Sequence, residues 1–498
     1  MTTTLHDHVL RSTGTRGDHP ALVDAVTGSV TTYAELGASV RALAGALHAR
    51  GLVKGDVVAL FAPNCPAFPV AFLAASRAGL TVTPVNALAT SADVARQLRD
   101  SGAKLLITVE AFLDRAAPAA RATGAGLLLC ESIPELVGEG HPAPAIAFDP
   151  ASDVAVLPYS SGTTGTPKGV VLTHRSVVAN LGQMQAYLTH TPEDVLLAVL
   201  PFSHIYGMQV LMNLGLASGA TVVTMPRFEL GAYLAALSSY RVTRAYVAPP
   251  IVVALAKSPL VDEFDLSSLQ VVLSAAAPLD GAIARLASTR LGVPVTQGCG
   301  MTELSGASHL VPFGECGKPG SIGRLVPGTE ARLVDPQTGA DTSGRGELWL
   351  HGPQVMVGYL NRPDATAETV DAEGWLHTGD IATVDADGDW FIVDRVKELI
   401  KFRGYQVAPA ELEAELLTSP DIADAAVVGA QVGGEEVPRA FVVRAPHAPG
   451  LTADDVIAYV GARVAPYKRV RAVEFVEAIP KAPSGKLLRR ELRCRVAG

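Results

Sequence analysis

The sequence is poor in cysteine and has no excess of basic residues, and each shortage excludes a class of protein. Its five cysteines among 498 residues are scattered and include no Cys-x-x-Cys pair, so they fit a reducing compartment better than a disulfide framework. The net charge of −9 argues against a nucleic-acid-binding surface, which needs clustered Lys and Arg. With 48% hydrophobic and 18% charged residues, the composition is that of a globular protein with a large core.

Segments that direct a chain to a membrane or an organelle are not evident either. The first ten residues, MTTTLHDHVL, lack a basic segment followed by an apolar run, so we expect no signal peptide. The stretch 195–226 contains no Asp, Glu, Lys or Arg. Pro201, Asn213 and three glycines interrupt it, so we predict two buried strands with a loop and a short helix between them rather than a membrane span. The ending RVAG is not a peroxisomal signal, and we expect a cytoplasmic protein.

What the sequence does contain is a regular alternation of helical and strand patterns. Residues 34–50 place Leu36, Val40, Leu43 and Leu47 at spacings of four, three and four, which predicts an amphipathic helix. Short continuous apolar runs such as GDVVALFAP and LQVVLSAAAPL are typical of parallel strands buried on both faces. From about Thr329 onward, short strands and Gly-rich turns indicate antiparallel sheets. The pattern predicts an α/β protein.

The segment YSSGTTGTPKGV, residues 159–170, combines glycines and hydroxyl side chains with one lysine. It is not a Walker loop, because that template requires a glycine at Pro167 and a Ser or Thr at Gly169. The segment still follows a predicted strand, offers many backbone N–H groups and carries the cation Lys168, which are the requirements for binding a polyphosphate. For such a composition alone, a flexible surface turn is the alternative interpretation.

Five blocks in fixed order give the sequence a resemblance to a known family. They read YSSGTTGTPKGV, QGCGMTE, HTGD, DRVKELIKFRGYQVAPAELE and PKAPSGKLLRR, and they resemble the adenylate-forming superfamily of acyl-CoA synthetases, luciferases and stand-alone adenylation domains. The stretches LPFSHIYG and KELIKFRGYQVAPAELE are most similar to 4-coumarate–CoA ligase-like enzymes. The resemblance implies that a carboxylate attacks the α-phosphate of ATP to give an acyl-adenylate and pyrophosphate, and that the thiol of coenzyme A then displaces AMP.

The resemblance also implies a domain organisation. We expect a large N-terminal domain, residues 1–394, of helix-covered sheets plus a distorted barrel, which holds the acid and ATP sites. A small mobile α+β domain, residues 395–498, is expected to close over it and to carry the hinge, a loop facing coenzyme A and the catalytic lysine.

For the nucleotide, the resemblance assigns a role to each block. Lys168 is expected at the β- and γ-phosphates, Glu303 at Mg²⁺, which takes one or two carboxylates plus phosphate oxygens, and Asp380 at the ribose. Lys486 is expected to be the catalytic cation between the attacking carboxylate and the α-phosphate, and Lys397 the hinge. Further expected ATP and AMP contacts are Ser160, Ser161, Gly162, Thr163, Thr164, Gly165, Thr166, Ala276, Gln297, Gly298, Cys299, Thr302, Arg395, Lys401 and Gln406.

The resemblance also implies contact residues for the acid and coenzyme A, and the sequence departs from the family pattern at two places. His204 is expected to be a catalytic residue and aromatic gate, and Tyr206 a pocket wall. Gly306 and Ala307 replace the Pro-Val of plant coumarate ligases, which predicts a roomier pocket, and Cys299 replaces a Tyr that stacks on adenine, a loss of about 1–3 kcal/mol. Also expected are Ala276, Gly298 and Gly300 at the acid, and Arg227, Arg403 and Gly404 at coenzyme A, with a surface Arg as the alternative for Arg227.

Several functions remain open at this point. The leading hypothesis is a carboxylate–CoA ligase for an aromatic, hydroxycinnamate-like acid, with ATP, Mg²⁺ and coenzyme A as cofactor and co-substrates. Alternatives are a medium-chain fatty acyl-CoA synthetase, a stand-alone adenylation enzyme that loads a carrier-protein thiol, a luciferase-type oxygenase and a non-catalytic relative that senses an acyl-adenylate. The physiological acid and the oligomeric state do not follow from the sequence.

Overall fold

The computed structural model describes residues 3–160, 167–396, 398–402, 405–432, 435–481 and 487–496. The chain forms two compact units. The first comprises Met1–Ala275, Gly281–Glu330 and His351–Leu376, and the second comprises Ala276–Asp280, Ala331–Leu350 and His377–Gly498. Strand β22 (Trp390–Arg395) runs through the domain boundary predicted between residues 394 and 395, and that boundary stays a prediction.

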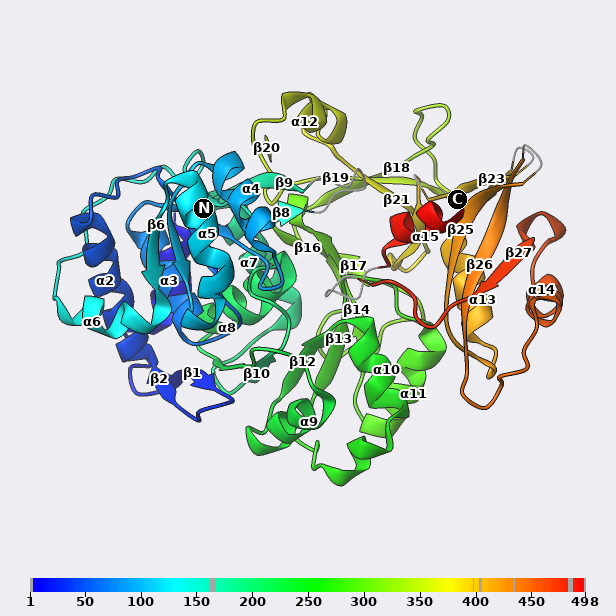
Figure 1. Cartoon of the computed structure of the whole chain (residues 1–498), viewed down its shortest axis with the longest axis horizontal. Helices are drawn as coiled ribbons and strands as arrows, with labels where there is room; N and C mark the ends of the chain where they lie inside the picture. The colour runs from blue at the N-terminus through cyan, green and yellow to red at the C-terminus, as the bar shows by residue number, and fades with distance from the viewer. Residues whose placement is uncertain are drawn as a thin grey trace. The chain divides into compact units, whose positions relative to one another are not determined.

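An eight-stranded sheet forms one half of the first unit. Its parallel core follows the buried apolar runs of the sequence, and helices lie beside it, as Figure 1 shows for α2, α3 and α5. The strand order is β20 (Gly358–Tyr359), β9 (Lys168–Thr173), β7 (Val154–Val156), β4 (Thr81–Pro84), β3 (Val57–Phe61), β5 (Ala103–Thr108) and β6 (Gly126–Leu129), and β8 (Tyr159–Ser160) pairs with β9. The main helices are α2 (Tyr33–Ala49), α3 (Ala67–Arg77), α4 (Ser91–Ser101) and α5 (Leu113–Thr123), with the shorter α1 (Leu5–Val9) and α6 (Ile133–Gly138).

Helix α2 shows why the periodicity of residues 34–50 predicts a helix. Thr32 and Glu35 form a capping box, in which the Thr32 side chain accepts the Glu35 N–H and the Glu35 carboxylate accepts the Thr32 N–H. The four predicted stripe residues, Leu36, Val40, Leu43 and Leu47, are fully buried, which confirms this element.

A seven-stranded sheet forms the other half of the first unit. All of its strand pairs are parallel except that of β1 with β2, and Figure 1 shows α9, α10 and α11 beside strands β12–β14. The order is β14 (Val295–Gln297), β13 (Val271–Ser274), β12 (Arg244–Val247), β10 (Val195–Ala198), β11 (Thr221–Thr224), β1 (Pro20–Asp24) and β2 (Val30–Thr32). The helices of this half include α9 (Leu230–Ser239), α10 (Pro249–Lys257) and α11 (Gly281–Leu291), whereas α7 (His174–Leu188) contacts β7 and β9 and α12 (Pro363–Thr369) contacts β20 of the eight-stranded sheet.

The uncharged stretch 195–226 forms two buried strands, β10 and β11, as predicted. The helix between them is a π-helix, η4 (Gly207–Leu214), followed by one turn of α8 (Gly215–Ala217). Within the described part of the chain, no helix combines the length and apolar character that a membrane crossing would need.

The second unit is built mainly from antiparallel strands, as the texture of the sequence after Thr329 predicts. One sheet has the order β18 (Glu330–Val334), β19 (Gly346–His351), β21 (Leu376–Val384) and β22, and β23 (Ile400–Phe402) pairs with β24 (Tyr405–Val407). Strands β25 (Ile422–Val432), β26 (Glu435–Arg444) and β27 (Ala472–Phe475) form a third sheet. Helices α13 (Pro409–Leu417) and α14 (Ala453–Gly461) lie beside that sheet (Figure 1), and α15 (Arg489–Val496) is the last helix of the chain.

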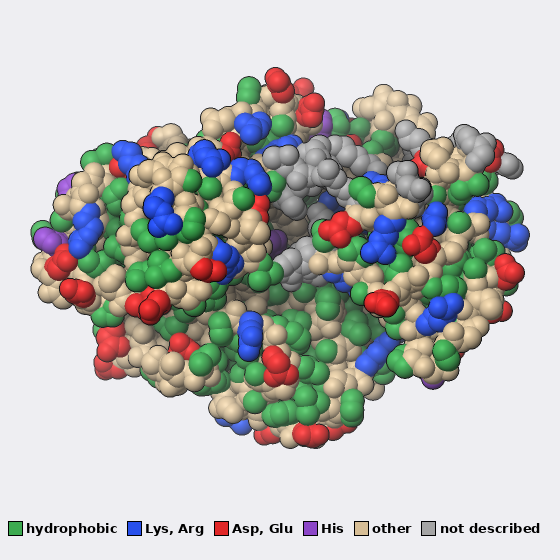
Figure 2. Space-filling view, in the orientation of Figure 1, with side chains coloured by type: hydrophobic (Ala, Val, Ile, Leu, Met, Phe, Trp, Pro, Cys, Tyr) green, Lys and Arg blue, Asp and Glu red, His purple; other side chains and the backbone are tan. Residues whose placement is uncertain are grey.

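The charges on the surface agree with the composition. Over the described residues on the face drawn in Figure 2, acidic and basic side chains are interspersed and neither sign forms a broad patch.

Candidate functional site

The two ends of the Gly-rich segment pair with each other as the two short antiparallel strands of a hairpin. Strands β8 and β9 are antiparallel, with Ser160 opposite Lys168 and Tyr159 opposite Gly169. The Tyr159 ring covers Gly169 so closely that a Cβ there would lie 3.1 Å from it, and the Tyr159 hydroxyl donates to Asp100 Oδ2 at 2.8 Å. The two ends of the segment are therefore held in register. The expected phosphate contacts Ser161, Gly162, Thr163, Thr164, Gly165 and Thr166 lie outside the described residues.

Glu303 meets this hairpin from a distant part of the sequence. It lies in the 3₁₀-turn η6 (Thr302–Leu304) and is buried, with 6% of its surface exposed. Its Oε1 atom accepts hydrogen bonds from Ser160 Oγ at 2.9 Å and from the Tyr359 hydroxyl at 2.8 Å. The ammonium group of Lys168 lies 4.6 Å from the centre of the Tyr359 ring. The structure thus brings together three residues that the sequence predicted, Ser160, Lys168 and Glu303.

Tyr359 is a member of this cluster that the sequence analysis missed. It belongs to β20, which pairs with β9 so that Tyr359 lies opposite Val170. Burial, and then the neighbouring Glu303 carboxylate, raise the pKa of Tyr359 well above its usual range, so the phenol stays protonated and acts as a donor. Its sequence context, MVGYLN, carries no charged or metal-ligating pattern that would have marked it.

The donor set around Glu303 fits Mg²⁺ better than a metal held by the protein alone. In the described ranges, no group of three or more His, Cys, Asp or Glu side chains is arranged to hold a metal ion. Magnesium commonly takes only one or two carboxylates and completes its shell with phosphate oxygens and water. A single buried carboxylate beside Lys168 and Ser160, at the base of the Gly-rich segment, matches that requirement.

The strand that follows Glu303 is packed backbone to backbone against β15. Strands β15 (Cys299–Met301), β16 (Gly306–Leu310) and β17 (Arg324–Leu325) form an antiparallel sheet. A Cβ on Gly300 would lie 2.1 Å from the Gly306 carbonyl oxygen, and a Cβ on Gly306 would lie 2.5 Å from Asn180 Oδ1. The absent side chain of Gly306 therefore makes room for Asn180, and the expectation that Gly306 enlarges the acid pocket stays a prediction.

The other residues of these blocks lie at strand ends. Gly298 N donates to the Ser274 carbonyl at 3.0 Å and connects β14 to β13. Gln297 is buried, Thr302 and Cys299 are half-buried, and Cys299 lies opposite His309 in the β15–β16 register. These positions are compatible with the expected adenine and phosphate contacts, which stay predictions.

The expected acid-binding residues His204 and Tyr206 lie in a turn between β10 and η4. Gly207 permits this turn, because a Cβ there would lie 2.3 Å from the Pro201 carbonyl oxygen. His204 is exposed and its Nδ1 accepts the Tyr206 N–H at 3.2 Å, while the Tyr206 hydroxyl donates to the Leu273 carbonyl at 3.0 Å. The side chain of Asn64 donates to the Ala198 and Leu200 carbonyls and accepts the Phe202 N–H, which fixes the chain just before His204. Both side chains are therefore oriented by backbone contacts.

Within the second unit, Asp380 and Arg395, the two residues expected at the ribose, form an ion pair. They lie opposite each other on β21 and β22, with Arg395 Nε 2.9 Å from Asp380 Oδ1. Within β21, Gly379 has φ 71° and the Thr378 hydroxyl accepts the Asp380 N–H at 3.0 Å, which orients the backbone at Asp380.

The remaining predicted residues are described only in part. On strands β23 and β24, Lys401 and Gln406 occupy opposite positions. In the second unit, Ala276 is exposed at φ 75°, and in the first unit Arg227 is exposed. Lys397, Arg403, Gly404 and Lys486 lie outside the described residues.

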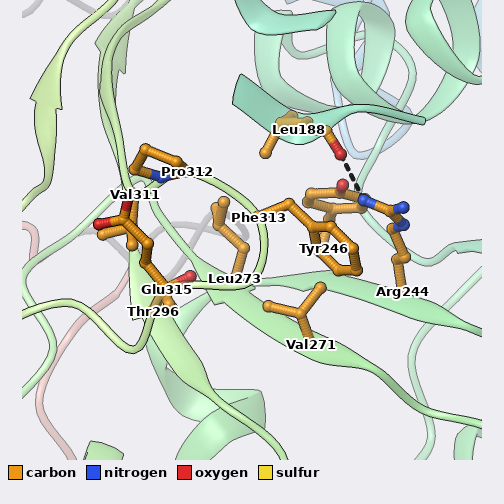
Figure 3. A pocket seen from close by; sticks show the side chains of 10 residues that line it. All are labelled: Leu188, Arg244, Tyr246, Val271, Leu273, Thr296, Val311, Pro312, Phe313 and Glu315. Carbon is orange, nitrogen blue, oxygen red and sulfur yellow. Dashed lines mark hydrogen bonds between the residues drawn. The ribbon is translucent and has the colours of Figure 1, made fainter. Parts of the chain in front are cut away.

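A small cavity lies near the buried ends of β12 and β13 (Figure 3). Its volume is about 10 Å³, which is room for one water molecule, so it is not a site for an acid or a nucleotide. Arg244 lines it, pairs with Asp194 at 2.8 Å and donates to the Leu188 carbonyl, the bond drawn dashed in Figure 3. The lining residues are Leu188, Arg244, Tyr246, Val271, Leu273, Thr296, Val311, Pro312, Phe313 and Glu315.

Comparison with known proteins covers nearly the whole chain. A family model for AMP-binding enzymes matches residues 10–360, and one for the AMP-binding enzyme C-terminal domain matches residues 411–486. The sequence is 42% identical over 527 residues to 4-coumarate–CoA ligase 1 of Arabidopsis thaliana, covering 99% of this chain and 92% of the relative.

Several solved structures match the fold at a TM-score of 0.92. One is ATP-bound MatB from Rhodopseudomonas palustris, 28% identical, with 99% of each chain covered. Another is the anthranilate CoA ligase AuaEII in complex with anthranoyl-AMP, 25% identical, with 99% of this chain and 97% of that chain covered.

Proposed function

Because the chain belongs to the AMP-binding enzyme family, we propose that it is an AMP-forming acid–thiol ligase that joins an aromatic carboxylic acid to coenzyme A. The observation that carries the proposal is the 2.9 Å hydrogen bond between Ser160 and Glu303. It joins one end of the Gly-rich segment to Glu303, the carboxylate that we assign to the metal ion.

The proposed reaction has two halves. In the first, a carboxylate oxygen of the acid attacks the α-phosphorus of ATP, the bond from that phosphorus to the bridging oxygen breaks, and pyrophosphate leaves. In the second, the sulfur of coenzyme A attacks the acyl carbon, the bond from that carbon to the AMP oxygen breaks, AMP leaves, and the thiol proton passes to solvent. The first half brings two anions together, so fixed positive charge must offset their repulsion.

The residues of the first unit supply part of that charge balance. Lys168, on the paired strand β9, is placed to meet phosphate oxygens, and its ammonium lies over the neutral Tyr359 ring. Glu303 would hold Mg²⁺, which when bound would neutralise charge on the phosphates. The paired strands keep Ser160 and Lys168 at a fixed spacing without any ligand, which is preorganisation of the kind that electrostatic catalysis requires.

In the second unit, we assign the ribose to Asp380 and Arg395, which already form an ion pair. A carboxylate can accept hydrogen bonds from both ribose hydroxyls, and Arg395 would add a donor. Lys486 is assigned as the cation that meets the attacking carboxylate and the α-phosphate, and Lys397 as the hinge. Arg227, Arg403 and Gly404 are assigned to coenzyme A.

An aromatic acid is the substrate class that the comparisons favour. The relative from Arabidopsis is named for 4-coumarate, and the AuaEII structure contains an anthranoyl-AMP. His204 and Tyr206 would contribute ring surfaces to such an acid. We also propose a cytoplasmic location, because all five cysteines are free and none requires an oxidising compartment.

The test is a panel of acids assayed for AMP release with and without coenzyme A. The panel includes hydroxycinnamates, benzoates and medium-chain fatty acids, and carrier protein replaces coenzyme A in a third arm. We expect AMP release to depend on an aromatic acid and to rise several-fold with coenzyme A. The Glu303→Gln variant measures the background of contaminating ligases. Equal rates with and without coenzyme A, or a preference for carrier protein, would contradict the assignment of the acceptor.

A further inference from the structure

The buried side-chain amide of Asn180 forms hydrogen bonds with both the backbone N–H and the backbone carbonyl of Ala307, beside the proposed site. Asn180 lies in helix α7 and is fully buried. Its Nδ2 donates to the Ala307 carbonyl at 2.7 Å, and its Oδ1 accepts the Ala307 N–H at 3.0 Å. A side-chain amide thus takes the place that a neighbouring strand would occupy at the start of β16, and both of the buried backbone groups are satisfied.

A chain of amides fixes the orientation of Asn180. Its second N–H donates to Gln183 Oε1 at 3.0 Å. Gln183 Nε2 in turn donates to Thr329 Oγ1 at 3.2 Å and to Gln354 Oε1 at 3.0 Å, so the oxygen of Gln183 is the atom left facing Asn180. A flipped Asn180 would point its NH₂ at the Ala307 N–H and its oxygen at both the Ala307 carbonyl and Gln183 Oε1. The network therefore selects one orientation.

The same network holds the residues just before Ala307 in an unusual backbone path. Ser305 has φ 56° and Gly306 has φ 140°, both in the region that non-glycine residues rarely adopt. The Ser305 carbonyl accepts from Gln209 Nε2 at 2.8 Å, and the Ser305 hydroxyl donates to the Gln354 carbonyl at 2.9 Å. This path is the turn by which the chain passes from Glu303 to β16 within three residues.

We propose that Asn180 is a positioning residue that sets the backbone of Ala307, and with it the wall that β16 presents to the acid substrate. The proposal rests on the proposed function only in assigning Ala307 to the acid pocket. Glu303 has its own contacts with Ser160 and Tyr359, so the effect of Asn180 falls on the acid and not on the nucleotide.

Two variants with side chains of similar size test the two hydrogen bonds between Asn180 and the Ala307 backbone. Asn180→Leu removes both hydrogen bonds, and Asn180→Asp keeps an acceptor for the Ala307 N–H but turns a carboxylate oxygen toward the Ala307 carbonyl. We expect each to raise the KM for the acid about tenfold or more, on the scale of leaving buried polar groups unpaired, while the KM for ATP stays within about twofold. Leu181→Ala is the control, because Leu181 is a fully buried apolar neighbour on the same helix. Its loss destabilises the fold but leaves both hydrogen bonds between Asn180 and Ala307 in place.

A second readout does not depend on activity. In Asn180→Leu the Ala307 N–H loses its acceptor, so amide hydrogen exchange of the peptide spanning residues 303–311 is expected to accelerate relative to Leu181→Ala. An acid KM and an exchange rate both equal to those of Leu181→Ala would overturn the proposal. If the wild-type protein ligates no acid, the proposed function fails, and the exchange measurement alone then decides whether Asn180 positions Ala307. If Asn180→Leu does not fold, Asn180→Asp replaces it in the measurement of the acid KM, and Asn180→Ala replaces it in the exchange measurement, because Ala also removes the acceptor for the Ala307 N–H.

Discussion

The Tyr359 hydroxyl donates a 2.8 Å hydrogen bond to Glu303, and the ring of the same Tyr359 lies 4.6 Å beneath the ammonium of Lys168. One neutral side chain thus contacts both charged groups that we assign to the triphosphate and its metal ion. Because the pKa of Tyr359 is raised by burial and by Glu303, the hydroxyl remains a donor throughout the physiological pH range. Tyr359 holds the carboxylate at one oxygen without adding a charge to the site.

Replacing Tyr359 with Phe should change the Mg²⁺ concentration that pyrophosphate exchange requires. Tyr359→Phe keeps the ring under Lys168 and removes one of two donors to Glu303, a hydrogen bond to a charged group worth about 1.5–3 kcal/mol. We expect the Mg²⁺ concentration for half-maximal pyrophosphate exchange to change about tenfold. Tyr187→Phe is the matched control, since the Tyr187 hydroxyl donates to the Leu325 carbonyl at 3.0 Å and is not assigned to the site. An unchanged magnesium dependence in Tyr359→Phe would remove this role.

Lys486 is assigned to the adenylation half-reaction alone. Lys486→Ala should lower adenylation ~10²-fold or more, on the scale of losing a preorganised electrostatic donor, while thioester formation from supplied acyl-adenylate largely survives. Stopped assays of each half-reaction measure the two rates. Lys481→Ala is the control, because Lys481 is a nearby lysine that pairs with Asp424 at 2.6 Å. Equal losses in both half-reactions would refute the assignment.

Cys299 occupies the position at which the resemblance leads one to expect an adenine-stacking Tyr. Cys299→Tyr should lower the KM for ATP by about tenfold, because base–aromatic stacking contributes about 1–3 kcal/mol. Initial rates at varied ATP measure the change, and Cys316→Tyr, at an exposed cysteine, is the control. A KM that stays the same or rises would show that another side chain already covers the adenine.

Acid should destabilise the first unit through buried histidines. The pKa of His174 is lowered to about 4, chiefly by burial, and its Nδ1 accepts the Leu5 N–H at 3.1 Å. Below pH 6.5 the unfolded chain therefore binds a proton that the folded chain excludes, and the stability from this group is lost as the pH falls from 6.5 to 4, about 3 kcal/mol in full.

His174→Asn isolates this contribution. Asn retains an acceptor for the Leu5 N–H and does not titrate, so the loss of unfolding free energy between pH 7 and pH 4.5 should be smaller than in the wild type by about 2–3 kcal/mol. Denaturant unfolding at the two pH values measures it. The same pH dependence in His174→Asn as in the wild type would mean that His174 is also protonated in the folded state.

Patterns that repeat along the chain predicted the elements well. The stripe of residues 34–50 gives α2, and the apolar runs give the parallel strands of both large sheets, because burial alone selects those residues. The π-helix η4 was not predictable in this way, since its residues are buried on every side and an apolar run has no period that separates one helix type from another.

Site residues that stand in recognisable sequence blocks were predictable, and site residues that are defined only by their contacts in the folded chain were not. Lys168 and Glu303 stand in recognisable blocks, and the structure places both around Tyr359. Tyr359 contacts Glu303, 56 positions away, and Asn180 contacts Ala307, 127 positions away, so no local pattern identifies them. The close approach at Gly306 was not predictable for the same reason, because the atom that a Cβ there would meet belongs to the distant Asn180.

The pairing of β1 with β11 determines when this protein can fold during synthesis. Leu22 lies beside Val222 in the seven-stranded sheet, and Gly358 lies beside Val171 in the eight-stranded one. Neither sheet is complete until a segment made roughly two hundred residues later leaves the ribosome, and pairings of such high contact order close slowly. A nascent or truncated chain that stops before β11 therefore carries β1 with one edge unpaired and needs protection from aggregation until its partner arrives.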